Sequence, residues 1–356
     1  KTLKERLLKL KFHNEIVGEI PIGALSSKAP LYNRKWSKHK MPEKKFKINS
    51  LKKIKFEDAF IKILSSSNHS SKKWVTEQYD QMVMGNTIQR SGSDSAILKI
   101  HNKEKAIAVT VDSSANYCKS HPYTGGKQII CETWRNLISV GAKPMAITNC
   151  LNFGNPEDEK IMGEFAECVK GIKESCEFLD FPVVSGNVSF YNGTNNRNIY
   201  PTPVIGGVGL LNKLNYCKNH LFKKKNNLIL IVGKTFGHLC QSAFFDEVYS
   251  LYDGPPPEVN LLNEKNNGNI ILNLIKKNLV CSVHDVSVGG LIIALSEMSI
   301  GSGLGIKIEK SKNMREKERS GANVLCDELP RYKTLAKEFY YQSNRFNVDV
   351  ASPKSF

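Results

Sequence analysis

Two polar segments in the middle of the sequence follow apolar runs and could bind a ligand. The first, residues 149–155, reads NCLNFGN and follows an apolar run that predicts a strand at residues 145–148. The second, residues 185–189, reads SGNVS and follows a predicted strand at residues 181–184. Proteins that mix strands and helices usually bind ligands in loops at strand ends. We therefore expect both segments to be binding loops.

Three common chemistries find no support in the sequence. Gly233, Lys234 and Thr235 resemble the end of a phosphate-binding P-loop, but that motif needs a glycine five positions before Gly233, where Leu228 stands. No Gly-x-Ser-x-Gly elbow occurs, and the histidines have no partner at metal-ligand spacing. P-loop, serine hydrolase and zinc chemistry are therefore not expected.

The segment between the two loops predicts a helix. Asn155 can cap it, Pro156 fits its first turn because no amide donor is needed there, and the acidic residues 157–159 complement the positive helix end. Its apolar residues recur at spacings of three and four, which predicts one buried face. They are Ile161, Phe165, Cys168, Ile172, Cys176 and Leu179. The order strand, helix, strand predicts a crossover that delivers both loops.

The remaining sequence alternates predicted strands and helices in two lobes. Two strands are expected within residues 95–111 and a helix after Gly125 and Gly126 that ends at Gly141. Later strands are expected at residues 228–232, 279–283 and 306–308, and later helices at residues 259–277 and 291–298. The predicted class is α+β. We expect a basic linker with one or two short elements at residues 1–71, then lobes at residues 72–211 and 212–356.

Composition narrows the class of protein. Nine cysteines are scattered singly with no CxxC pair, which predicts reduced thiols in the cytoplasm instead of disulfides or zinc ligands. The longest apolar runs are much shorter than the roughly 20 residues that span a bilayer. Residues 1–11 alternate basic and apolar residues, unlike a signal peptide. We expect no membrane segment.

The net charge of +17 raises the question of nucleic-acid binding. Residues 1–75 contain 19 Lys or Arg against 6 Asp or Glu, and the other 281 residues contain 32 against 28. The excess therefore lies in one N-terminal stretch. That stretch is either a patch for phosphorylated ligands or RNA, or a solvated linker, and we favour the linker because aromatic platforms for bases are not interleaved with the charge. No nucleic-acid partner is expected.

Several blocks in register resemble phosphoribosylformylglycinamidine synthase. The match runs from about residue 15 to about residue 308, in family order and spacing, and resembles the second half of the synthase subunit. The blocks are YDQ at 79–81, GNT at 85–87, AITNCLNFGNPE at 146–157, VVSGNVSFYN at 183–192, PTPVIG at 201–206 and HDVSVGGL at 284–291. The resemblance implies the two-lobed ATP-binding fold of the aminoimidazole ribonucleotide synthetase superfamily, with an N-terminal-type domain followed by a C-terminal-type α/β domain.

The resemblance also implies roles for four residues. Asn149 and Gly186 match nucleotide contacts, Asn187 matches a Mg²⁺ ligand, and Ser189 matches a contact to the substrate, formylglycinamide ribonucleotide. These residue types suit the roles, because glycine lets a phosphate approach the backbone, an amide oxygen ligates hard Mg²⁺, and a hydroxyl bonds a phosphate or amide. Each residue alone would otherwise be read as a loop cap.

The implied activity is ATP-dependent conversion of formylglycinamide ribonucleotide to the amidine with glutamine-derived ammonia, in purine synthesis. ATP and Mg²⁺ are the implied cofactors. A glutamine amidotransferase subunit, a small bridging subunit and the first half of the synthase are the implied partners. The Ser-His-Asn-His segment with the family's catalytic histidine has no match here, so we expect no catalytic residue in this chain and no activity from it alone.

Alternatives stay open on the sequence. The chain could be a non-catalytic nucleotide-binding scaffold, or a related synthetase such as aminoimidazole ribonucleotide synthetase. Asp112 and Asp285 each follow a strand and could bind Mg²⁺, although Asp285 could instead cap the next helix. Residues 324–332 depart from the family pattern, and the tail lacks the closing strand that the family would have.

Overall fold

The computed structural model describes residues 6–28, 30–46, 50–195, 197–233 and 237–307, and the backbone of residues 346–350. By their internal contacts, residues 1–35 and residues 36–356 form two separate units. The first unit is an antiparallel hairpin of β1 (Leu7–Phe12) and β2 (Glu15–Pro21), followed by the 3₁₀ turn η1 (Ile22–Leu25). Together with α1 (Phe56–Leu64), this is more regular structure than we expected in residues 1–71.

A six-stranded sheet with the order β3-β4-β5-β10-β6-β7 forms the first lobe of the second unit. Its strands are β3 (Thr87–Gln89), β4 (Ala96–Lys99), β5 (Ala106–Ser113), β6 (Lys143–Asn152), β7 (Val183–Ser189) and β10 (Thr202–Leu211). All neighbours are antiparallel except β6 and β7, which run parallel. The two strands expected within residues 95–111 are confirmed as β4 and β5. β7 is an edge strand.

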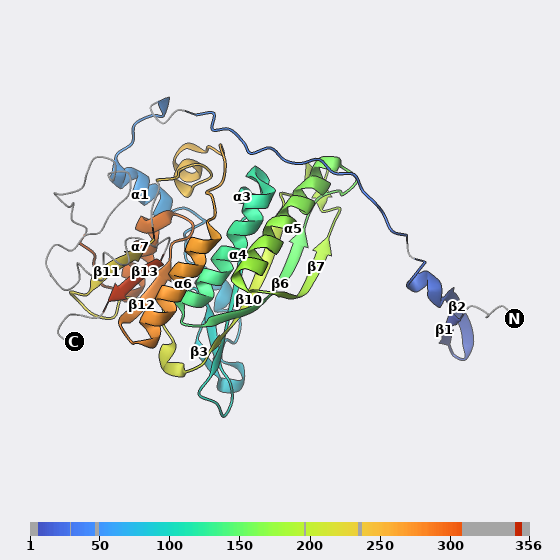
Figure 1. Cartoon of the computed structure of the whole chain (residues 1–356), viewed down its shortest axis with the longest axis horizontal. Coiled ribbons are helices and arrows are strands. Elements are labelled where there is room, and N and C mark those ends of the chain that lie inside the picture. The colour runs from blue at the N-terminus through green and yellow to red at the C-terminus, as the bar shows by residue number, and fades with distance from the viewer. Residues whose placement is uncertain are drawn as a thin grey trace. The chain divides into compact units, whose positions relative to one another are not determined.

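Helices cover one face of this sheet (Figure 1). They are α3 (Ala115–Ser120), α4 (Pro122–Ser139) and α5 (Glu159–Leu179), while α2 (Lys73–Thr76) and η3 (Val83–Gly85) precede β3. α4 lies at the centre of the core: it packs on β5 and β10 and against α5 and α6, and most of its residues are buried. The predicted helix end is confirmed, because α4 stops at Ser139 and Gly141 follows with φ of +87°, which favours glycine.

The other face of the same sheet is open and partly apolar. Along β5 and β10 buried and accessible residues alternate, as expected for strands with one covered face. Val111, Val184, Val208 and Met145 are 67%, 71%, 40% and 45% exposed. An accessible apolar face of this extent marks a surface that a further protein element can cover.

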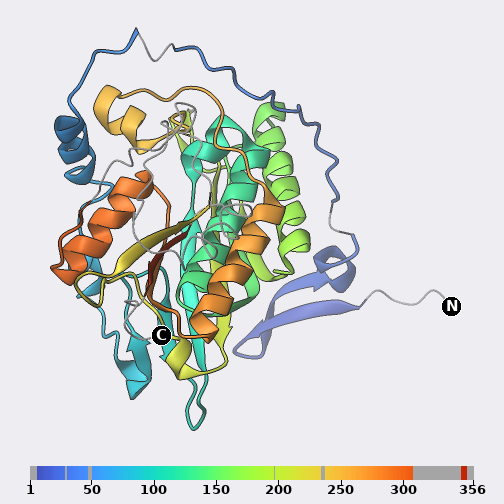
Figure 2. The same ribbon diagram turned by 60° about the vertical axis from the view of Figure 1, so that its left-hand side comes forward.

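The second lobe is built on a three-stranded antiparallel sheet with the order β11-β13-β12 (Figure 2). Its elements are β11 (Leu228–Val232), η5 (Phe244–Val248), α6 (Leu261–Lys276), β12 (Val280–Asp285), α7 (Gly290–Ser302) and β13 (Phe346–Val350), and the short turn η4 (Leu214–Tyr216) leads into it. β10 ends at Leu211 and β11 begins at Leu228, and the lobe boundary at residues 211 and 212 stays a prediction.

Two expectations for the second lobe are wrong. Ile306 and Lys307 lie in no strand, while Ile308, the last residue of the expected strand, lies outside the described residues. A closing strand does exist: β13 lies between β11 and β12 and pairs with both. The sequence FNVDV alternates apolar and polar residues, which is the strand pattern that we overlooked.

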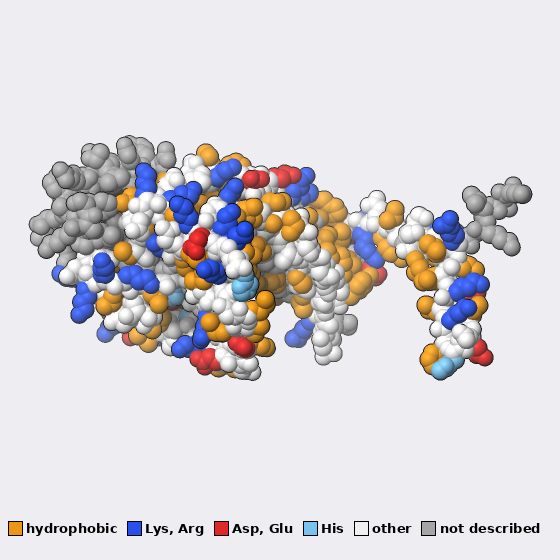
Figure 3. All heavy atoms as spheres, turned by 90° about the horizontal axis from the view of Figure 1, so that it is seen from below, with side chains coloured by type: hydrophobic (Ala, Val, Ile, Leu, Met, Phe, Trp, Pro, Cys, Tyr) orange, Lys and Arg blue, Asp and Glu red, His pale blue; other side chains and the backbone are white. Residues whose placement is uncertain are grey.

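Some sequence predictions fall outside the described residues. These are Lys234 and Thr235 of the rejected P-loop, Ile308, and the divergent block at residues 324–332. The eight cysteines in the described part are free thiols. No helix in that part is long and apolar enough to cross a membrane. On the face drawn in Figure 3, basic side chains are scattered among apolar and uncharged ones instead of gathering in one patch.

Candidate functional site

The four residues predicted to contact ligands lie on two neighbouring strands, β6 and β7. In the parallel ladder Asn149 lies opposite Gly186, and Asn152 lies opposite Ser189. Asn187 follows Gly186 on the same strand. The prediction that these residues come together is therefore supported, but the prediction of loops is wrong for residues 149–152 and 185–189. The first stretch continues β6, because β10 pairs its backbone on to Asn152, and the second belongs to β7, because β6 pairs its backbone on to Ser189. Residues 153–155 lie beyond the end of β6. We call Asn149, Gly186, Asn187 and Ser189 the edge-strand site.

The crossover helix between the strands is confirmed as α5, but its start differs from the prediction. Asp158, not Asn155, caps the helix, and its side chain accepts a hydrogen bond from the amide of Lys160. The Asn155 side chain instead accepts from the amide of Glu157, which closes a turn just before the helix. Both residue types cap helices well, so local sequence could not choose between them.

Gly186 and Asn149 point toward the same face of the sheet. A Cβ atom on Gly186 would lie 2.1 Å from Asn149 Oδ1, so a larger residue would push the Asn149 amide aside. Asn149 alternates with Ile147 and Leu151, both buried, and so faces α5. Asn187 and Ser189 alternate with Gly186 and therefore point toward the open face. The edge-strand site thus spans both faces of the last strand.

The Ser189 hydroxyl is held by a local network. Ser189 Oγ donates to Asn192 Oδ1 at 3.2 Å, while Asn192 Nδ2 donates to the Ser189 and Phe153 carbonyl oxygens, each at 3.0 Å. The hairpin of β8 (Gly193–Thr194) and β9 (Arg197–Asn198) follows, and Asn198 Oδ1 accepts a hydrogen bond from the Asn155 amide in the turn after β6. Asn192 therefore joins the end of β7 to the turn after β6 and fixes the direction of the hydroxyl.

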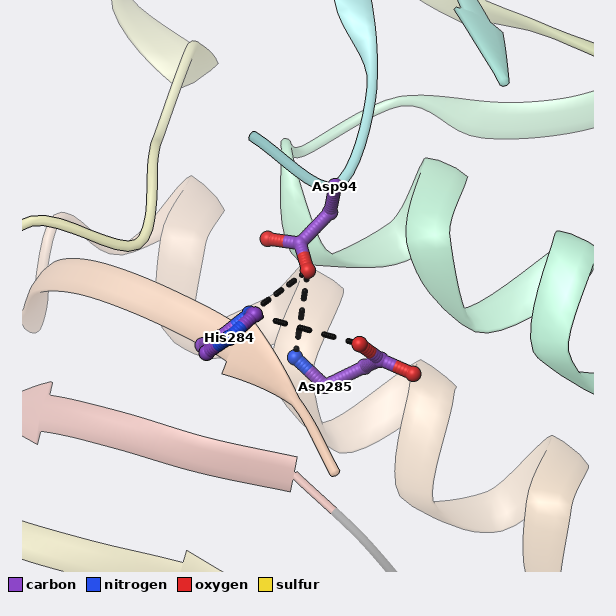
Figure 4. Close-up of side chains that lie close together, drawn as sticks. All are labelled: Asp94, His284 and Asp285. Carbon is purple, nitrogen blue, oxygen red and sulfur yellow. Dashed lines mark hydrogen bonds and ion pairs between the residues drawn. The ribbon is translucent and has the colours of Figure 1, made fainter. Parts of the chain in front are cut away.

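A second polar group, which sequence analysis did not assemble, joins the two lobes. His284 and Asp285 end β12, Asp94 precedes β4, Arg135 lies on α4 and Glu264 on α6; we call these five residues the interlobe charge cluster. His284 Nδ1 lies 2.7 Å from Asp94 Oδ1 (Figure 4), and Arg135 Nη1 lies 3.1 Å from Glu264 Oε1. Arg135 Nε also lies 3.7 Å from Asp285 Oδ2. All five side chains are buried.

Burial and mutual pairing set the charges of this cluster. Burial alone would lower the pKa of His284, but the adjacent Asp94 carboxylate, together with Glu297, raises it well above its usual value. Burial would raise the pKa of Asp94, yet His284 holds it below its usual value. Burial and the nearby Asp94 charge raise the pKa of Asp285. His284 is therefore an imidazolium that neutralises Asp94 across the lobe boundary.

A metal ion has two candidate positions in the described part of the chain. Asp94, His284 and Asp285 offer ligand atoms within 4.8 Å of one another. His284 Nδ1 already lies against Asp94 Oδ1, so a cation there would have to replace the imidazolium charge. The second position is Asn187, which is exposed and makes no hydrogen bond through its side chain to the described residues. Its amide oxygen suits Mg²⁺, but a single neutral ligand needs the rest of the shell from elsewhere.

Asp112 and Asp285, the weaker Mg²⁺ candidates, are both tied to other residues. Asn136 Nδ2 donates to Asp112 Oδ1 at 2.8 Å, and burial together with Glu132 raises the pKa of Asp112 to about 7. The alternative that Asp285 caps the next helix is wrong, since α7 begins at Gly290 with Gly289 at its N-cap. The HDVSVGGL block identified His284 and Asp285 as a pair, but no signal linked them to Asp94.

Both lobes of the chain match known protein families. Residues 92–211 match the N-terminal domain of AIR synthase related proteins, and residues 225–336 match the C-terminal domain of the same proteins. The PurL subunit of phosphoribosylformylglycinamidine synthase from Pelagibacter ubique is 52% identical over 312 residues, 87% of this chain. The chain belongs to this PurL family. The family and the fold class implied by the resemblance are confirmed.

Further relatives agree with this assignment. PurL from Bradyrhizobium diazoefficiens is 43% identical over 84% of the chain. The solved PurLQS structure from Thermotoga maritima has a TM-score of 0.62 at 22% identity and covers 98% of this chain and 47% of that one. T. maritima PurL has also been solved with ATP and with FGAR, at TM-scores of 0.58 and 0.59. This chain spans 43% of the Pelagibacter relative and 41% of the Bradyrhizobium relative.

Proposed function

We propose that this chain supplies nucleotide, Mg²⁺ and substrate contacts to a synthase that converts formylglycinamide ribonucleotide to formylglycinamidine ribonucleotide. The ladder between β6 and β7 carries the proposal, because it brings Asn149, Gly186, Asn187 and Ser189 together on one sheet edge. The 52% identity to a PurL subunit supports the reaction. The T. maritima PurL complexes with ATP and FGAR support the two ligands.

Each residue of the edge-strand site has its own role in the proposed reaction. Asn149 and Gly186 bind the nucleotide, and the Ser189 hydroxyl, held by Asn192, binds the substrate. Transfer of the ATP γ-phosphoryl group to the substrate amide oxygen gives an iminophosphate, and ammonia displaces phosphate from it. Mg²⁺ at Asn187 would neutralise phosphate charge. None of these four residues carries a group that titrates near neutral pH, so they leave proton transfer to other residues, which we assign to the remaining part of the synthase.

The open face of the six-stranded sheet is a candidate interface for the other half of the synthase. The chain spans 43% of its Pelagibacter relative, and Val111 and Val184 on the open face are 67% and 71% exposed. We assign this face to the remaining part of the synthase. The T. maritima assembly called PurLQS supports the further partners, a glutamine amidotransferase and a small bridging subunit, and we place the enzyme in the cytoplasm.

A split-enzyme assay tests the proposal. This chain is co-produced with the part of the Pelagibacter relative that it does not span, and amidine formation is measured with ATP, Mg²⁺, formylglycinamide ribonucleotide and ammonium chloride. We expect product from the pair and none from this chain alone. Ser189→Ala should raise KM for the ribonucleotide about tenfold, as expected for one lost hydrogen bond to a charged group. Ser185→Ala on the same strand is the matched control.

The outcomes separate the alternatives. Product from this chain alone would contradict the need for a first half. A pair that assembles and binds ATP but forms no product would favour a nucleotide-binding scaffold. Product from an aminoimidazole precursor instead of formylglycinamide ribonucleotide would assign the chain to aminoimidazole ribonucleotide synthetase.

A further inference from the structure

The hairpin of β1 and β2 has one face made of apolar side chains. Leu8, Leu10 and Phe12 alternate along β1 and so point the same way. Ile20 lies opposite Leu8 in the ladder and shares this face. A Cβ atom on Gly18, the partner of Leu10, would lie 3.6 Å from Leu10 Cδ1, so the Leu10 side chain lies over the glycine. We call Leu8, Leu10, Phe12 and Ile20 the apolar hairpin face.

The opposite face of the hairpin is mixed. Lys9 lies there opposite Glu19, and Lys9 Nζ pairs with Glu19 Oε1 at 2.9 Å. Ile16 lies opposite Lys11, beyond the register shift that follows Leu10. The charged side chains keep this second face compatible with water, so the apolar hairpin face is the one that needs a cover.

The apolar hairpin face is exposed in the structure. Its four side chains are 44%, 57%, 67% and 36% exposed, in the order given above. A two-stranded hairpin is at best marginally stable in water and needs a third strand or a packed face. In the described part of the chain this sheet holds only β1 and β2, so the outer edge of each strand is unpaired. The hairpin therefore has both an apolar face and free backbone groups for a further sheet.

The relatives indicate which protein part covers this face. The hairpin precedes residue 92, where the first of the two matched AIR synthase domains begins, so neither domain of this chain includes it. The fold match to T. maritima PurLQS covers 98% of this chain, a share too large to leave out residues 7–21, but only 47% of the solved chain. The hairpin thus has a counterpart in a chain about twice as long.

We propose that the apolar hairpin face docks on the part of the synthase that this chain does not span, an inference that rests on the proposed function. The apolar side chains pack on an apolar surface of that part, and the outer edge of one strand pairs with a strand there. This contact is additional to the open face of the six-stranded sheet, because the hairpin belongs to a separate unit. Two linked contacts bind a partner more tightly than either contact alone.

A pair of lysine substitutions tests the proposal on this chain and the unspanned part of the Pelagibacter relative. Leu10→Lys puts a charge at the centre of the apolar hairpin face, where docking would bury it without a partner, and should raise Kd between the two parts at least tenfold. Ile16→Lys is the matched control on the mixed face, where the residue is 48% exposed, and should keep Kd within twofold. An unchanged Kd for Leu10→Lys, or an equal rise in both variants, would overturn the proposal.

Hydrogen exchange gives a second test that needs no substitution. Amides of residues 7–21 should exchange at least tenfold more slowly in the pair than in this chain alone, because docking pairs one outer edge and covers the apolar hairpin face. Equal exchange in the two samples would overturn the proposal. Slow exchange in this chain alone that increases with its concentration would also overturn it, since a second copy would then cover the face.

Both measurements separate this inference from the proposed function, because they need binding but no turnover. If the hairpin is protected in a pair that forms no amidine, the docking contact stands and only the proposed function fails. If the pair forms amidine while Leu10→Lys binds as tightly as the parent, only the docking contact fails.

Discussion

The interlobe charge cluster and the edge-strand site are opposites in environment and composition. The cluster holds five ionisable side chains, all buried, and pairs them between lobes. The edge-strand site holds two amides, a hydroxyl and a glycine on an accessible edge, with the Asn149 and Asn187 side chains unpaired in the described part of the chain. Buried charged residues therefore pair with one another between the two lobes, whereas the proposed ligand contacts are uncharged groups on an accessible edge.

The largest expected effect comes from removing the cation at the centre of the cluster. Arg135→Met leaves the buried Glu264 and Asp285 carboxylates without their guanidinium, so we expect the free energy of unfolding to fall by about 3–5 kcal/mol. Urea unfolding at pH 7 measures this. Lys173→Met, which removes an exposed pair with Glu177, is the control and should change it by less than about 0.5 kcal/mol. Equal losses of the free energy of unfolding in the two variants would show that the buried charges contribute no more to stability than the exposed pair.

A carboxyl next to the cluster gives the next largest effect, and it depends on pH. Asp112 has a folded-state pKa of about 7, above the ordinary value of 3.8, so the folded state holds a proton that the unfolded state releases. The free energy of unfolding should therefore fall as pH rises from 4 to 7, by up to about 1.4 kcal/mol per pH unit from this group. Asp112→Asn should remove that slope. If the free energy of unfolding changes with pH in parallel for the variant and the parent between pH 4 and pH 7, Asp112 does not titrate as described.

On the edge-strand site, Gly186→Ala should separate binding from stability. The new Cβ displaces the Asn149 amide instead of a rigid backbone atom, so we expect a loss of stability below about 1 kcal/mol but a several-fold higher KM for ATP. Thermal unfolding and the split-enzyme assay measure the two quantities. A large loss of stability with unchanged KM would make Gly186 a packing residue.

The smallest expected effect concerns the support of Ser189. Asn192→Ala removes the acceptor and donor that orient the Ser189 hydroxyl, so KM for formylglycinamide ribonucleotide should rise about fivefold with KM for ATP unchanged. Asn195→Ala on the same hairpin, away from Ser189, is the control. If both KM values rise together, Asn192 shapes the whole hairpin and not the hydroxyl alone.

Sequence patterns predicted the parts of the fold that depend on neighbours along the chain. The spacing of apolar residues in α5 and the apolar runs before it and after it predicted the parallel crossover of β6 and β7. The boundaries were less accurate, because Asn155 and Asp158 are equally good caps and only packing selects one of them. The polar residues of both segments were assigned to loops because their pairing partners are distant in the sequence: β10 pairs with the first segment, and β6 pairs with the second.

The sequence by itself determined the family, through blocks in register, and it predicted the residues of the edge-strand site, through their match to those blocks. Only the tertiary structure decided which faces of β7 these residues occupy, since a bulge in the ladder resets the alternation there. It alone also joined Asp94 to His284, which are 190 positions apart. Electrostatic pairing of buried charges acts through space and leaves no periodic trace along the chain, so no local pattern could have predicted it.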